Sequence, residues 1–171
     1  MQKAVHVGEG AMAAIIGLEM DVVREITITA AQGQICQIAN DNSPGQIVVS
    51  GATAAIDRAV ELAKDKGARM AVLLPVSAPF HCDMMQPAAT VMQAELESTD
   101  LRQAAIPVVA NVLASAISRP EEIKARLVDQ VTGMVRWRES VVFMADNGIR
   151  SLYEIGTGKV LTGLARRITA H

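Results

Sequence analysis

Residues 34–50, QICQIANDNSPGQIVVS, contain two apolar runs of strand length on either side of a cluster of turn residues. Gly, Pro, Asn and Asp favour turns, so residues 41–45 (DNSPG) are expected to form the connection. Residues 34–40 and 46–50 are therefore predicted to pair as the two strands of a hairpin.

Helical patterns lie on both sides of this hairpin. Residues 19–33 place apolar side chains near helical spacing and end at Gly33, a residue type that is common at helix C-termini. The second pattern is predicted to begin at Thr53, as a side-chain N-cap, and to stop at Gly67. Its apolar stripe consists of Ile56, Ala59, Val60 and Ala63.

Two more apolar runs of strand length flank these helices, at residues 12–18 (MAAIIGL) and 68–75 (ARMAVLLP). The order of elements over residues 12–75 is then β-α-β-β-α-β, which is the order of a ferredoxin-like sandwich. We expect this region to form a small subdomain with its own core.

The remaining residues alternate between helices and strands, which is typical of α/β layering. Helical patterns cover residues 83–98, a segment that opens at 119–122, and residues 138–147 and 160–168. Strand patterns cover residues 106–112 and 151–155. Because two short strands make a poor sheet for four helices, we expect them to be edges of a sheet whose other strands lie elsewhere.

Composition argues against several classes of function. The 171 residues carry a formal net charge of −2 and only 2% aromatic residues, so neither a basic surface nor a stacking platform for nucleic acid is expected. No apolar run approaches the length that spans a bilayer, about 18 residues, and no signal pattern is present. Two cysteines and three dispersed histidines (His6, His81 and His171) argue against a disulfide framework or a metal site and favour a reducing, cytoplasmic setting.

The sharpest local feature is residues 77–82 (SAPFHC), between the strand that ends at Pro75 and the next helix. Such loops place side chains at the open edge of an α/β sheet, where binding sites form. His81 suits a general base there, because histidine titrates near neutrality. A histidine that only fills the loop is the simpler alternative. Cys82 is interpreted as structural, because adjacent residues seldom point at one another.

Other patterns are weaker. Residues 156–159 (GTGK) lack the full spacing of a phosphate-binding loop; an anion could bind at this helix start, but a plain strand-to-helix turn also explains it. Arg136 and Arg138 flank Trp137 and fit either an acidic partner or a solvated helix start. The chain contains no G-x-S-x-G, the elbow on which a serine acyltransferase holds its nucleophile.

Several motifs stand in the same order as in one enzyme family and cover nearly the whole chain. They are residues 8–18 (GEGAMAAIIGL), 42–51 (NSPGQIVVSG), 75–81 (PVSAPFH) and 153–164 (YEIGTGKVLTGL). They resemble malonyl-CoA:acyl-carrier-protein transacylases. The chain is identified on this basis as the C-terminal part of a member of that family.

The resemblance implies an α/β-hydrolase-like large subdomain into which a ferredoxin-like small subdomain is inserted. Residues 1–11 would be the entry segment from the missing N-terminal portion of the large subdomain. Residues 12–75 would be the small subdomain, and residues 76–171 the C-terminal part of the large one. The strands without visible partners are explained in this way.

The resemblance also implies a ping-pong reaction, without a cofactor. A serine takes malonyl from malonyl-CoA as an ester and passes it to the phosphopantetheine thiol of acyl carrier protein. His81 matches the catalytic base, and Gln130 matches the residue whose main-chain carbonyl orients that base. The G-H-S-x-G elbow, and the arginine that pairs with the malonyl carboxylate, would lie in the missing N-terminal portion.

Phe80, Ser77 and Asn42 are carried over from the resemblance as substrate-binding residues. In related acyltransferase domains a Phe before the histidine goes with malonyl rather than methylmalonyl units, because the ring crowds an α-methyl group.

Two alternatives to this function remain. One is a non-catalytic ferredoxin-like module that binds a carrier protein or ligand, and the other is a fragment of a polyketide synthase acyltransferase domain.

These 171 residues alone are expected to show no malonyl transfer, because they contain a base but no elbow serine for it to activate. The intact mass of the purified chain, measured before and after exposure to malonyl-CoA, should stay unchanged. An adduct of one malonyl group, or transfer that is lost in His81→Ala, would contradict this expectation.

Overall fold

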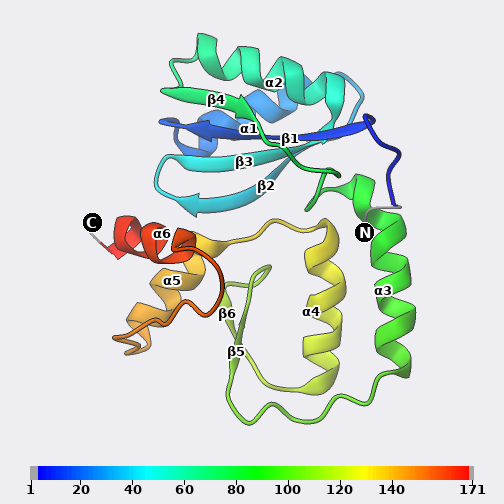
Figure 1. The fold of residues 1–171 in the computed structure, drawn as a ribbon, viewed down its shortest axis with the longest axis vertical. Coiled ribbons are helices and arrows are strands. Elements are labelled where there is room, and N and C mark those ends of the chain that lie inside the picture. Colours follow the sequence, from blue (N-terminus) through cyan, green and yellow to red (C-terminus); the bar gives the residue numbers. More distant parts are fainter. Residues whose placement is uncertain (1–3, 170–171) are drawn as a thin grey trace.

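A computed structural model describes residues 4–169 and has a four-stranded antiparallel sheet at one end of the molecule (Figure 1). The strands are β1 (Gly10–Ile16), β2 (Cys36–Ser43), β3 (Gln46–Ala52) and β4 (Met70–Leu73), in the spatial order β2-β3-β1-β4. Helices α1 (Met20–Ala31) and α2 (Thr53–Asp65) cover one face. The predicted β-α-β-β-α-β order is therefore confirmed.

One hydrophobic core lies between this sheet and its two helices. Val23 and Ile26 of α1, Ile56 of α2, and Ile15 and Val49 of the sheet are all buried in it. The inward side chains recur at helical spacing in the helices and alternate along β1, which is why the sequence pattern predicted this region well.

The hairpin turn is shorter than predicted. Asp41 and Ser43 remain in β2 and pair with Ile47 and Gln46, so only residues 44–45 form the turn, with Gly45 at φ 65°. Asp41 stays in the strand because its main-chain N–H donates to the carbonyl of Val135, far along the chain.

Thr53 does not cap α2, as the sequence suggested. It is the first residue of the helix, its N-cap is Ala52, and the Thr53 hydroxyl donates to the carbonyl of Gly8 at 2.7 Å. The hydroxyl thus ties the chain before β1 to the start of α2.

The strand predicted over residues 68–75 is limited to β4, Met70–Leu73, and lies at an edge of the sheet. β4 pairs only with β1. Ala71 faces the core, whereas Met70, Val72 and Leu73 are exposed.

The rest of the molecule is a looser α/β arrangement beside the sheet (Figure 1). It consists of η1 (Asp83–Met85), α3 (Gln86–Ser98), β5 (Val108–Ala110), β6 (Ser115–Ile117), α4 (Pro120–Thr132), α5 (Trp137–Asp146) and α6 (Val160–Thr169). Pro87 and Pro120 lie in the first turns of α3 and α4, where a missing N–H costs nothing.

The strand predictions for this part were less successful. The strand expected at 106–112 shortens to β5, which pairs with β6, a strand that was not predicted. The strand expected at 151–155 is wrong: this segment is irregular, because no strand in the described part of the chain lies alongside it.

Strand β2 joins the two parts. The main chain of Val135 donates to Ala39 at 2.8 Å and accepts from Asp41 at 2.9 Å. Beside these bonds, the guanidinium of Arg138 binds the buried carboxylate of Asp41 through Nε at 2.8 and 3.1 Å. These contacts fix the segment between α4 and α5 against the sheet.

Within residues 4–169, no helix is long and apolar enough to cross a membrane. The same residues contain no group of three or more His, Cys, Asp or Glu side chains placed to hold a metal ion. His171 lies outside the described residues.

Arg138→Ala is expected to lower the free energy of unfolding by about 3 kcal/mol, because it leaves the Asp41 carboxylate, only 2% exposed, without its partner. The partly exposed guanidinium places this value at the low end of the range for broken buried pairs. Arg24→Ala is the matched control: its pair with Asp21 is exposed and should contribute at most about 1 kcal/mol. Urea unfolding measures both, and equal losses would contradict the assignment.

Candidate active site

The first half of the loop that carries His81 is held against strand β1 of the sheet. The N–H of Leu74 donates to Met12 of β1 at 2.8 Å, and the ring of Pro79 packs directly on Gly10. Any side chain at Gly10 would place its Cβ within 2.3 Å of Pro79 Cγ, so glycine is required there. The close approach of β1 determines where the loop turns.

His81 adopts a left-handed backbone conformation, with φ 60°. Such a conformation is uncommon for residues other than glycine, and it is concentrated at functional positions. The adjacent Cys82 is fully buried, and its Sγ lies 3.2 Å from the carbonyl oxygen of Pro79. Burial raises the pKa of the Cys82 thiol, which favours a structural rather than a nucleophilic cysteine.

The other end of the loop is held by β2. Gln37 and Asp83 form a reciprocal pair, in which Gln37 Nε2 donates to Asp83 Oδ2 and the main-chain N–H of Asp83 donates to Gln37 Oε1, both at 2.8 Å. His81 therefore lies between two anchors, Pro79 on β1 and Asp83 on β2.

The imidazole of His81 contacts the end of α4. Its Nδ1 lies 2.8 Å from the main-chain carbonyl oxygen of Gln130. The last carbonyls of a helix have no partner within the helix, and that of Asp129 is taken by the N–H of Gly133. A carbonyl oxygen only accepts, so Nδ1 carries the proton and Nε2 is left as an acceptor.

Asn111 was missed by the sequence reasoning. It follows β5, and its Nδ2 donates to the side-chain oxygen of Gln130 at 3.2 Å, while its carbonyl accepts from the N–H of Arg136. The only available signal was a polar residue within the strand predicted at residues 106–112. Its relation to Gln130 depends on the β5–β6 hairpin, which the sequence did not indicate.

The residues predicted to bind substrate, Phe80, Ser77 and Asn42, are less closely connected to the His81–Gln130 pair. The ring of Phe80 is half-buried and packs on two small apolar clusters that include Ala78 and Met12. Ser77 is exposed in the loop, and Asn42 is half-buried in β2. Among the described residues, neither Ser77 nor Asn42 makes a hydrogen bond to His81 or Gln130.

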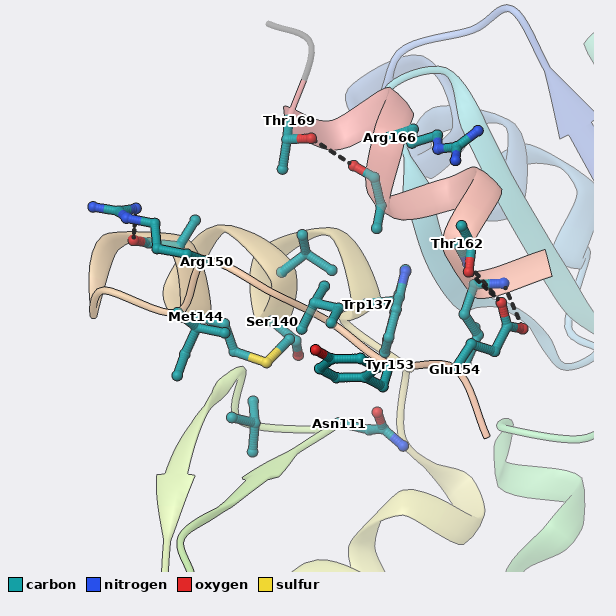
Figure 2. A pocket seen from close by; sticks show the side chains of 17 residues that line it. Asn111, Trp137, Ser140, Met144, Arg150, Tyr153, Glu154, Thr162, Arg166 and Thr169 are labelled. Atoms are coloured by element: carbon teal, nitrogen blue, oxygen red, sulfur yellow. Dashed lines mark hydrogen bonds between the residues drawn. The ribbon is translucent and has the colours of Figure 1, made fainter. Parts of the chain in front are cut away.

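The anion site considered at residues 156–159 is already filled. The carboxylate of Glu154 accepts from the main-chain N–H groups of Leu161 and Thr162, at 3.1 and 2.9 Å, and from the hydroxyl of Thr162 at 2.7 Å (Figure 2). These N–H groups belong to the first turn of α6, where they have no partner within the helix. The carboxylate of Glu154 therefore occupies the position that a bound anion would take.

The two arginines around Trp137 also have internal partners. Arg136 binds Glu139, one turn further along α5, and the carbonyls of Val112 and Leu113. The guanidinium of Arg136 holds the pKa of Glu139 below its ordinary value. With Arg138 bound to Asp41, neither arginine has the free position that an acidic partner would need.

Solved structures with this arrangement are found among malonyltransferases. No family model matches the chain. A solved acyl-carrier-protein-S-malonyltransferase from Bartonella henselae is 55% identical, with a TM-score of 0.94 over 98% of this chain and 53% of that one. A malonyl-transacylase solved in complex with its type II PKS acyl-carrier protein is 43% identical, with a TM-score of 0.96 over 99% of this chain and 55% of that one.

Curated sequences agree with these structures. A malonyl CoA-acyl carrier protein transacylase from Bacillus subtilis is 41% identical over 98% of this chain and 53% of its own length. The chain is thus homologous, over nearly its whole length, to the malonyl CoA-acyl carrier protein transacylases. It spans about half the length of the curated relatives that it matches.

Hydrogen bonds from the Thr162 hydroxyl and from the main-chain N–H groups of the first turn of α6 lower the pKa of Glu154, so the cap should be fully formed at neutral pH. Because the folded pKa is depressed, the contribution of Glu154 to stability is present above its unfolded pKa and is lost as pH falls through the folded pKa. Carbon-13 NMR should give a carboxyl midpoint below the ordinary glutamate value, and the amide shifts of Leu161 and Thr162 should follow it. In Glu154→Gln these amides should lose that titration, whereas Glu121→Gln should leave it unchanged. A midpoint at or above the ordinary value would contradict the cap.

Proposed function

We propose that the chain is the histidine-bearing part of an enzyme that transfers malonyl from malonyl-CoA to the phosphopantetheine thiol of acyl carrier protein. The observation that carries the proposal is the 2.8 Å contact between His81 Nδ1 and the Gln130 carbonyl. It leaves Nε2 free to accept a proton, which a general base requires. The relationship to malonyl transacylases supports the same role.

The architecture proposed with this function has three segments. Residues 1–11 enter from the large subdomain, residues 12–75 form a ferredoxin-like small subdomain, and residues 76–171 form the C-terminal part of an α/β-hydrolase-like large subdomain. The observed order β2-β3-β1-β4 supports the middle assignment. Residues 1–3 and 170–171, at the two ends, lie outside the described residues.

The remaining half of the enzyme would supply the serine. In the first half-reaction, Nε2 of His81 takes the proton of the serine hydroxyl while the oxygen attacks the thioester carbon of malonyl-CoA. The tetrahedral intermediate expels the CoA sulfur, which takes the proton back from the imidazolium. Products are a malonyl-serine ester and CoA thiol, with His81 neutral again.

The second half-reaction repeats these steps with the carrier protein. Nε2 takes the proton of the phosphopantetheine thiol, the sulfur attacks the malonyl ester, and the serine oxygen leaves with the proton from the imidazolium. In both halves, the Gln130 carbonyl at the partially negative end of α4 stabilises the positively charged imidazolium. No cofactor takes part in this scheme.

Such a reaction fits fatty-acid synthesis, and the complex with a type II PKS acyl-carrier protein extends the range of carriers among relatives. A reducing cytoplasm is the proposed setting, in keeping with Cys36 and Cys82, which are both unpaired and buried. The competing idea of a self-contained binding module is weakened by large apolar side chains that are exposed in the second part of the molecule, among them Val108, Leu152 and Ile155.

The test uses a chimera, in which this chain replaces the matched region of the Bartonella henselae malonyltransferase. The chimera should transfer malonyl, and His81→Ala within it should lower kcat by about 10²–10⁴, the contribution typical of a general base. His6→Ala, an exposed histidine outside the site, is the matched control and should leave kcat unchanged. An active chimera in which His81→Ala equals the parent would refute the assignment.

Phe80 is proposed to favour malonyl over methylmalonyl, because its ring stands next to the base and would crowd an α-methyl group. In the chimera, Phe80→Ser should shift the ratio of kcat/KM for methylmalonyl-CoA over malonyl-CoA upward by about 10-fold or more, the effect of one methylene in a pocket. Phe143→Ser, in α5, is the control for loss of a phenyl ring elsewhere. An unchanged ratio would exclude Phe80 from specificity.

A further inference from the structure

The carbonyl that contacts His81 lies in the last turn of α4, where the helix itself does not hold it. The helix ends at Thr132, and Gly133 is extended, with φ −87° and ψ 155°. The Gln130 carbonyl therefore lacks the N–H donor that a further turn would supply, and it accepts from His81 Nδ1 instead. Because helix ends fray, the direction of this carbonyl depends on contacts from outside the helix.

The turn between β5 and β6 (residues 111–114) supplies such contacts. The β5–β6 hairpin lies beside α4 (Figure 1), and the carbonyl of Asn111 accepts from the N–H of Arg136 at 2.9 Å. A side chain on Gly133 would bring its Cβ within 3.0 Å of Val112 Cγ1. The turn is therefore in direct contact with the chain just after the helix.

This turn is itself firmly held. The N–H of Ala114 donates to the carbonyl of Ala110 at 2.8 Å and closes the turn. The guanidinium of Arg136 donates to the carbonyl of Leu113 at 3.2 Å and is in turn bound by Glu139. Asn111 therefore extends its side chain from a fixed position.

The side chain of Asn111 reaches the same residue that His81 contacts. Its Nδ2 donates to Oε1 of Gln130 at 3.2 Å, and both side chains are half-buried. A cavity of about 130 Å³, lined in part by Ile123, Leu127 and Gln130, lies between the hairpin and α4. Apolar packing around Gln130 is therefore incomplete, and the hydrogen bond to Asn111 is what fixes its side chain.

We propose that Asn111 is a positioning residue for the base. It acts through Gln130: by holding this side chain, it keeps residue 130 in the helical conformation that directs the carbonyl at His81 Nδ1. Without this bond the last turn of α4 frays and Nδ1 loses its acceptor for part of the time. The imidazole can then carry its proton on Nε2, where it cannot act as a base. The proposal rests on the proposed function, in which His81 is that base.

The kinetic test uses the chimera with the Bartonella henselae malonyltransferase. Asn111→Leu and Gln130→Met remove the same hydrogen bond from its two sides, keep similar side-chain shapes and leave the Gln130 carbonyl in place. Each should lower kcat/KM by about 3- to 10-fold, the factor that corresponds to one ordinary hydrogen bond. The loss should be equal for malonyl-CoA and for acyl carrier protein, because one base serves both half-reactions.

Two comparisons separate positioning from a general effect on the fold. The double variant should lose no more than either single variant, because both substitutions remove one interaction. Asn147→Leu is the matched control: this asparagine donates to the carbonyl of Phe143 at 2.8 Å, at the end of α5, and its loss should leave both kcat/KM values unchanged.

The tautomer of His81 is measured independently of activity. Nitrogen-15 NMR of histidine-labelled chimera distinguishes a protonated from an unprotonated ring nitrogen, and the His81 resonances are those that disappear in His81→Ala. At a pH where His81 is neutral, the proton should lie mainly on Nδ1 in the parent. In Asn111→Leu and in Gln130→Met, the fraction with the proton on Nε2 should at least double.

Three results would overturn the positioning role: losses that add in the double variant, a Gln130→Met chimera equal to the parent, or an unchanged tautomer in both single variants. An inactive parent chimera in which the variants still change the tautomer would support the positioning role and count against the proposed function. An active chimera with an unchanged tautomer would refute the positioning role alone.

Discussion

The position of the candidate site depends on one strand. β2 bonds to Val135 through the main chain of Ala39 and Asp41, and the Asp41–Arg138 ion pair reinforces this junction. Val135 follows α4, which carries the Gln130 carbonyl. At its other end β2 holds Asp83 through Gln37, and Asp83 follows the His81 loop. His81 and the Gln130 carbonyl lie 49 residues apart in the sequence, and contacts with the same strand hold both of them in position. Because a strand within a sheet is rigid, it keeps the two groups 2.8 Å apart.

The molecule has two different kinds of packing. In the sheet region, glycines allow the main chain to approach its neighbours closely: a side chain on Gly51 of β3 would collide with the carbonyl of Ile35, just before β2, and one on Gly10 of β1 would collide with Pro79 of the His81 loop. The cysteine in this region, Cys36, is so well enclosed that burial raises its pKa to about 11. Around α5 and α6, by contrast, buried apolar side chains such as Val141 and Leu164 lie beside several exposed ones, among them Val142, Ile149 and Val160.

The sequence predicted best where structure depends on near neighbours. The four strands and two helices of the sheet region follow from alternation and helical spacing, and His81 stood out by its place between a strand and a helix. Failures occurred where the partner is distant. Asp41 stays in β2 because of Val135 and Arg138, and residues 151–155 form no strand because a strand needs a neighbour. Gln130 was found only through family resemblance. Every residue has a main-chain carbonyl, so the residue type does not indicate which carbonyl contacts the histidine. Asn111 depends on an unpredicted hairpin, so nothing in the pattern indicated it.

The left-handed backbone at His81 has a consequence for how this loop evolves. A φ of 60° costs an L-residue with a full side chain about 1–2 kcal/mol, while glycine adopts it freely and asparagine more readily than most. Selection for stability alone would drift position 81 toward glycine or asparagine. Histidine at this position therefore lowers the stability of the fold locally, and in return it places an imidazole in contact with the end of α4.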